Sequence, residues 1–142
     1  MTLSYVDMIG VPYKLHGVLP HGLDCSTVCE EVLRRLDLSS PPTSSFRYPN
    51  SSGELGEFEK YMHKASDELE LVGTEARHAT RPGDILLVSS ADCEQSRGMY
   101  VLVDQDLFLT CLHRSGVTPV SRQAILRLKT PVMGVYRCAP SE

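Results

Sequence analysis

The sequence predicts an α+β fold, with N-terminal helices packed on a mostly antiparallel β-sheet. The clearest helical patterns lie in the first half of the chain, whereas short apolar segments separated by tight turns follow residue 70. Helices followed by a run of strands are typical of α+β domains. A chain of 142 residues without repeats or a linker is expected to form a single domain, 1–142.

Two helices and a loop are predicted before residue 39. The first helix is short, covers 3–9 and stops at Gly10. Residues 13–24 are rich in Gly, Pro and His and are expected to form a loop. A longer helix is expected from Ser26, because apolar residues recur at helical spacing. They are Val28, Cys29, Val32, Leu33 and Leu36.

The middle of the chain predicts a long loop and one more helix. Residues 39–53 hold six Ser and three Pro, and a loop of this length is either functional or ordinary surface. Residues 54–69 read as an exposed amphipathic helix, with apolar residues along one side.

The second half predicts strands joined by turns. "RPGD" at 81–84 and the pair Gln105–Asp106 mark tight turns, and Ser121 can cap a short helix over 122–128. The predicted strands cover 70–73, 84–90, 98–104, 107–113, 117–120 and 131–137.

Composition excludes several classes of partner. The net charge is −4 and there is no basic run, so nucleic acid is not an expected partner. No apolar stretch approaches the ~18–20 residues of a membrane span. The N-terminus lacks the features of a signal peptide, so a cytoplasmic location is expected, or release by a route that needs no signal of its own.

The cysteine pattern predicts neither a disulfide framework nor a metal site. The five cysteines are an odd number, form no CxxC pair and lack partners at zinc-site spacing. We therefore expect reduced thiols, no metal and no cofactor. The cysteines are Cys25, Cys29, Cys93, Cys111 and Cys138.

Cys25 is the candidate nucleophile. It follows Asp24 at the predicted start of the longer helix. A helix N-terminus offers partial positive charge and free backbone N–H groups, which favour a thiolate and can stabilise an oxyanion. On position alone, the alternative that Cys25 is a small buried residue at a helix start remains open.

The residues around Cys25 resemble the signature of the NlpC/p60 family of cysteine peptidases. The segment "GVPYKLHGVLPHGLDCSTV" contains a G-x-P-Y motif, a Gly-containing loop and "DCS" at a helix start. Downstream, "RPGDILLV", "RGMYVLVDQDLFLTCLHRSGV" and "VMGVYR" resemble the family's core strands, so only about 39–70 lies outside the resemblance. The matching motif residues are Gly10, Pro12, Tyr13, Asp24, Cys25 and Ser26.

This resemblance implies a papain-like fold and a substrate class. Members cut short cell-wall peptides at the γ-D-glutamyl to diamino-acid bond, and Cys25 would attack the amide carbon to form a thioester. Tyr13, Asp24 and Ser26 match positions that hold the amine end of the peptide. They also have structural readings, because Tyr13 can pack the loop and Asp24 can cap the helix.

The family's histidines appear at neither expected position. Alignment on Gly98 places Ser96 where the catalytic base belongs, and Thr110 where a second histidine orients it. Arg97 stays protonated and cannot be a base, although it could favour the Cys25 thiolate. His113 is three residues past Thr110, so strand alternation places it on the opposite face, and only a bulge or turn would bring it to Cys25.

Other histidines remain open as substitutes for the base. His16 and His21 lie in the loop before Cys25, where geometry cannot be read from sequence, and His63 and His78 are expected to be solvated.

The sequence therefore predicts a catalytically degenerate protein of cell-wall peptidase lineage. It would serve as a structural or peptide-binding component, with a cell-wall or other short peptide, or proteins of a phage tail or cell-wall assembly, as partners, and a cytoplasmic or virion-associated location. The alternatives are an active cysteine peptidase or amidase using Cys25 with a non-standard base, and an interaction module with an inert Cys25.

Overall fold

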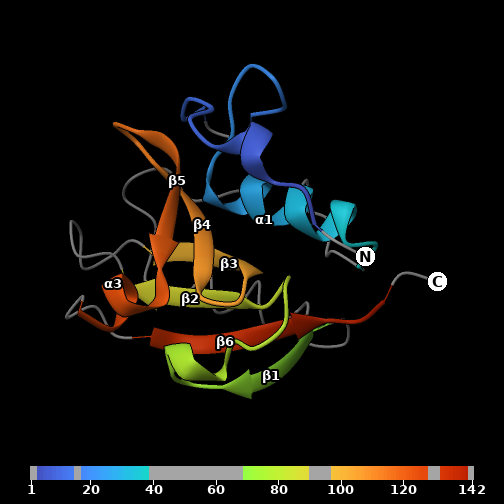
Figure 1. Cartoon of the computed structure of the whole chain (residues 1–142), viewed down its shortest axis with the longest axis vertical. Coiled ribbons are helices and arrows are strands. Elements are labelled where there is room, and N and C mark those ends of the chain that lie inside the picture. The colour runs from blue at the N-terminus through green and yellow to red at the C-terminus, as the bar shows by residue number, and fades with distance from the viewer. Residues whose placement is uncertain (1–2, 15–16, 39–68, 90–96, 128–131, 141–142) are drawn as a thin grey trace.

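The computed structural model describes residues 3–14, 17–38, 69–89, 97–127 and 132–140. Six strands form one sheet in the order β1-β6-β2-β3-β4-β5, and each neighbouring pair is antiparallel. The fold is thus α+β with an antiparallel sheet, as predicted (Figure 1). The elements are η1 (Val6–Met8), α1 (Cys25–Arg35), β1 (Leu69–Gly73), η3 (Ala76–His78), β2 (Ile85–Ser89), β3 (Arg97–Asp104), β4 (Leu107–Leu112), β5 (Gly116–Ser121), α3 (Arg122–Arg127) and β6 (Val132–Cys138).

Most predicted elements lie within one or two residues of the observed ones. The exceptions are the first helix, which is only the turn η1, and η3, which was not predicted. A single 3-10 turn is too short to produce a helical period. The loop predicted at 39–53 and the helix at 54–69 lie outside the described residues. Among the described residues, no helix is long and apolar enough to span a membrane.

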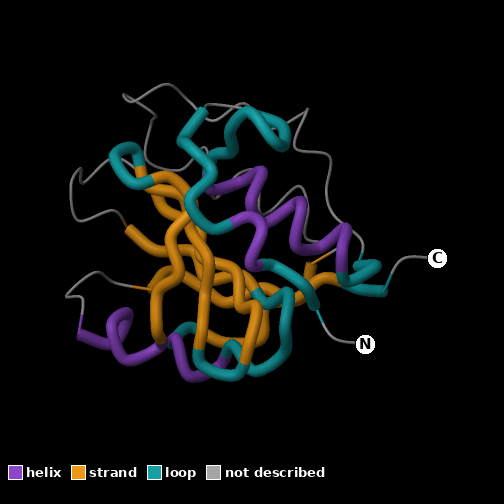
Figure 2. The backbone as a smooth tube through the Cα atoms, turned by 45° about the horizontal axis from the view of Figure 1, so that its top comes forward, coloured by secondary structure: helices purple, strands orange, loops and turns teal. Residues whose placement is uncertain are grey.

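The sheet is buried on both faces. Along β2, β3 and β4, successive side chains point to opposite faces of the sheet, and the buried ones belong to two separate hydrophobic clusters. One cluster includes the buried face of α1, and the other includes Ile125 of α3 and Ala76 of η3. Figure 2 shows the strands between these helices. On β4, Leu109 and Cys111 belong to the α1 cluster and Phe108 to the other, so strand alternation turns Thr110 away from α1.

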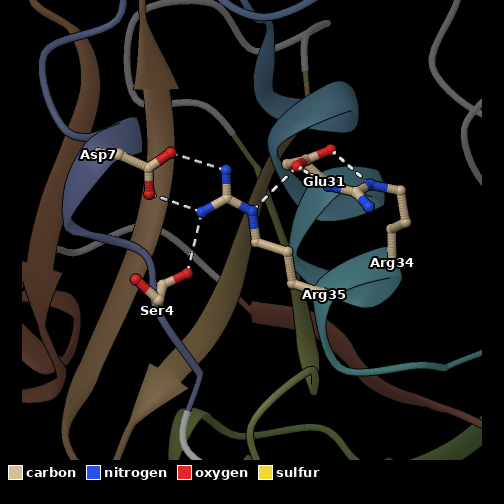
Figure 3. Close-up of polar contacts among 5 residues, drawn as sticks. All are labelled: Ser4, Asp7, Glu31, Arg34 and Arg35. Carbon is tan, nitrogen blue, oxygen red and sulfur yellow. Dashed lines mark hydrogen bonds and ion pairs between the residues drawn. The ribbon is translucent and has the colours of Figure 1, made fainter.

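The N-terminal segment is attached to α1 by one arginine. Arg35 donates to both carboxylate oxygens of Asp7 at 2.6 and 2.8 Å, and to the Ser4 carbonyl at 2.9 Å (Figure 3). Its Nε also donates to Glu31 at 2.9 Å. The ion pair with Asp7 holds η1 against α1, and Gly10 N–H donates to the Val117 carbonyl, which places this segment beside β5.

Arg35→Ala is expected to destabilise the protein by about 1 kcal/mol near neutral pH, because Asp7 is largely exposed and its ion pair is screened. The hydrogen bond from Arg35 lowers the pKa of Asp7 below its ordinary 3.8, and that from Arg34 lowers the pKa of Glu31 below 4.5. A lowered folded-state pKa contributes stability that is present above the ordinary value and lost as pH falls through the folded value.

The difference in unfolding free energy between wild type and Arg35→Ala should therefore shrink below about pH 4. Urea unfolding at pH 7 and pH 3 measures it. Arg34→Ala is the matched control, since exposed Arg34 contacts Glu31 but makes no described contact with Asp7. This variant should lose less free energy of unfolding than Arg35→Ala. An equal loss for both variants at pH 7 would contradict the importance of the Asp7 contact.

Candidate active site

Asp24 determines where α1 begins. Its Oδ1 accepts hydrogen bonds from the Thr27 amide at 2.8 Å and the Ser26 hydroxyl at 2.7 Å. The Asp24 amide donates to Thr27 Oγ1 at 2.8 Å, which completes a capping box. Because Asp24 is the N-cap, the first helical residue is Cys25, one residue earlier than predicted. Asp24 is only 1% exposed, so its carboxylate has a clear structural role here.

Cys25 is the most accessible of the four described cysteines. All four are free thiols, but Cys29, Cys111 and Cys138 are buried, whereas Cys25 is half-buried. Burial raises the pKa of Cys29 well above that of an ordinary thiol. Among these four thiols, the one at the helix start is therefore the one that an outside molecule can reach, and its role as the nucleophile stays a prediction.

Cys111 of β4 lies against the segment that leads to Cys25. Its Sγ donates to the Leu23 carbonyl at 3.0 Å, across 88 residues of sequence. Burial, and then the charges of Cys25 and Asp24, raise the pKa of Cys111 to about 12. A protonated thiol thus occupies the β4 position that faces the start of α1.

Thr110, predicted to orient a base, is not brought to Cys25. Its hydroxyl donates to the Met99 carbonyl at 2.8 Å, and its side chain is 2% exposed. As shown above, it lies on the face of the sheet away from α1. Ser96, predicted at the position of the base, lies outside the described residues, and its role stays a prediction.

Tyr13 and His113 form a stacked pair. Their ring centroids are 4.1 Å apart with planes inclined by 25°. Tyr13 forms a parallel bridge with Leu23, in which Leu23 N–H donates to the Pro12 carbonyl and Lys14 N–H donates to the Leu23 carbonyl, both at 3.0 Å. Burial, and then the charges of Asp24, Cys25 and Cys111, raise the pKa of Tyr13. Tyr13 therefore lies near Asp24, Cys25 and Cys111, and its ring also contacts the His113 ring.

The placement of His113 changes the sequence interpretation. His113 directly follows β4, and its ring stacks on Tyr13, which packs against the cluster that contains Cys111 and the buried face of α1. His113 therefore lies on the side of the sheet that carries Cys111 and α1. The sequence interpretation disfavours His113 because it takes Thr110 to face the nucleophile. The signal that could have identified it is its even spacing from Cys111: the two positions are two residues apart, which is the period of one strand face.

The other predicted binding residues divide into two groups. Ser26 is buried and donates to Asp24, so both residues are engaged at the helix start. Tyr13 is half-buried and so remains partly accessible. Among the residues described here, no group of three or more His, Cys, Asp or Glu side chains could hold a metal ion.

Comparison with known proteins shows a similarity at the level of the family. The model of the family described as "NlpC/P60 family" matches residues 10–133. No curated protein matches the chain. Two solved structures, NlpC2 and NlpC1 from Trichomonas vaginalis, are similar with TM-scores of 0.54 at 18% and 19% identity. Each match covers 90% of this chain, but only 42% of NlpC2 and 39% of NlpC1.

Proposed function

Since this chain belongs to the NlpC/P60 family, we propose that it is a catalytically degenerate domain of cell-wall peptidase lineage. It binds a short peptide beside Cys25 and does not hydrolyse it efficiently. Its setting is an assembly that meets the cell wall, such as a phage tail, in which binding suffices without turnover. The support for binding is the half-buried thiol at the α1 N-terminus near half-buried Tyr13.

The state of Cys111 carries the proposal of degeneracy. A base must accept the proton of the nucleophile and later deliver it to the leaving amine, which contributes roughly 10²–10⁴-fold in rate. Cys111 faces the start of α1, but a pKa of about 12 keeps it protonated near neutral pH, and its proton is donated to Leu23. Thr110, on the other face, donates its own hydroxyl to Met99.

Incubation with γ-D-glutamyl-L-lysine should show binding without turnover. We expect wild type to release free lysine no faster than Cys25→Ala, because no described β4 side chain facing α1 can act as a base. Chromatography measures the release of lysine, and calorimetry measures binding. Release by wild type that is abolished in Cys25→Ala would overturn the proposal of degeneracy.

One observation favours a second candidate, an active cysteine peptidase or amidase. The stack with Tyr13 brings the His113 ring to the side of the sheet that carries Cys25, where it could serve as a non-standard base. This candidate predicts lysine release by wild type that is lost in both Cys25→Ala and His113→Ala. Loss in Cys25→Ala alone would leave His113 without a catalytic role.

A further inference from the structure

The accessible groups near Cys25 come from two segments far apart in sequence. Tyr13 belongs to the segment before α1, and His113 follows β4. The stack between their rings brings the two segments together. Figure 1 shows the β4–β5 hairpin on the same side of the molecule as the N-terminal segment. Asp24 and Ser26 are buried and bonded to each other, so a ligand beside Cys25 would meet the Tyr13–His113 pair more readily than those two residues.

Tyr13 supports His113 in a defined orientation. The bridge to Leu23 fixes the Tyr13 backbone, and the tyrosine ring covers one face of the imidazole. Since His113 is exposed, the rest of its ring remains accessible to solvent. An imidazole N–H at the ring edge can donate a hydrogen bond to an acceptor on a ligand.

The charges around this pair favour an anionic ligand group. Within 10–14, 17–24 and 112–116, the exposed charged side chains are Lys14 and Arg114, which are both cationic. The acid in these ranges is Asp24, which is buried in the capping box. Electrostatic complementarity at such a surface selects a carboxylate over a neutral amide of the same shape.

We propose that His113, supported by Tyr13, contacts the bound peptide and selects ligands that carry a free carboxylate. This inference rests on the proposed peptide-binding function. It assigns His113 a binding role that needs no proton transfer, and it names the chemistry of the ligand. Arg114, which adjoins His113 in the chain, adds positive charge to the same surface.

A matched pair of peptides tests this selection. γ-D-glutamyl-L-lysine carries the α-carboxylate of the glutamyl residue, and its α-amide lacks only that charge. Binding is measured by calorimetry in the Cys25→Ala background, so that the ligand stays intact. We expect the carboxylate peptide to bind about tenfold more tightly than the amide, since one hydrogen bond to a charged group typically changes the dissociation constant by about this factor.

His113→Ala in the Cys25→Ala background should remove this preference, because it should weaken the binding of the carboxylate peptide alone. His113→Phe keeps an aromatic ring on Tyr13 but no N–H, and should lose the preference as well. Arg127→Ala is the control, since Arg127 lies on α3, which packs on the other face of the sheet. It should bind both peptides like the parent.

The outcomes separate the inference from the proposed function. If the carboxylate and amide peptides bind the parent equally, or if His113→Ala preserves the preference, the inference fails while peptide binding stands. If neither peptide binds the parent, both fail. As a readout that does not depend on the folding of a variant, addition of the carboxylate peptide should shift the His113 imidazole signals in NMR spectra, and unchanged signals would overturn the contact.

Discussion

Asp84→Ala is expected to lower the free energy of unfolding by about 3 kcal/mol, the largest stability effect that we predict for a single polar side chain here. Asp84 is 1% exposed and accepts from the Thr80 and Arg81 amides, both at 3.0 Å. It also accepts from Arg137 Nε at 2.9 Å and Nη2 at 2.7 Å. Alanine would leave a largely buried guanidinium and two amides without these acceptors.

Urea unfolding at pH 7 measures this loss. Asp106→Ala is the matched control, because Asp106 also pairs with an arginine, Arg122 at 2.9 Å, but is largely exposed. Exposed pairs contribute at most about 1 kcal/mol, so this variant should unfold close to wild type. Similar losses in both variants would show that burial does not determine the effect, contrary to our expectation.

Alkylation is expected to modify Cys25 far faster than the buried cysteines of the native protein. A thiol whose pKa is raised from 9.0 to about 12, as for Cys111, has a thiolate population about a thousandfold below the ordinary one at pH 8. Cys25 is more accessible and lies at a helix N-terminus, which favours the thiolate. We expect Cys25 to react at least about 100-fold faster than Cys111.

Iodoacetamide labelling followed by mass spectrometry of the peptides gives the two rates. The control is the same protein unfolded in urea, in which Cys25 and Cys111 should react at similar rates because burial is lost. A second comparison is made at pH 6, where Cys25 should react faster than a free thiol. Native rates that are equal for Cys25 and Cys111 would contradict both the burial argument and the candidate nucleophile.

The local features of the fold could be read from the sequence because each depends on residues close in the chain. The periodicity of Val28, Val32 and Leu33 predicts α1, and these residues are buried as expected. Ser121 caps α3 through its hydroxyl, which accepts from the Ala124 amide at 3.1 Å. The "RPGD" turn precedes β2, since the Asp84 carboxylate binds the turn amides.

The side chains of β4 that face α1 could not be predicted from the sequence in the same way. A strand with one solvated face shows alternating polar and apolar residues, and this alternation identifies its buried side. In "LFLTCLH" apolar residues occupy both sets of positions, because Phe108 packs in one core cluster and Leu109 in the other. The assumption that Thr110 faced Cys25 therefore had no support from the pattern.

The sequence by itself determined the family, the order of α1, α3 and the six strands along the chain, and the position of Cys25 at the start of a helix, because motifs and local periodicity encode all three. Only the tertiary structure decided which side chains of β4 meet that helix. The contact from Cys111 to Leu23 spans 88 residues, and the stack of Tyr13 on His113 joins residues still farther apart in the sequence. Such contacts depend on how the hairpin of β4 and β5 packs against the N-terminal segment, which no local pattern specifies.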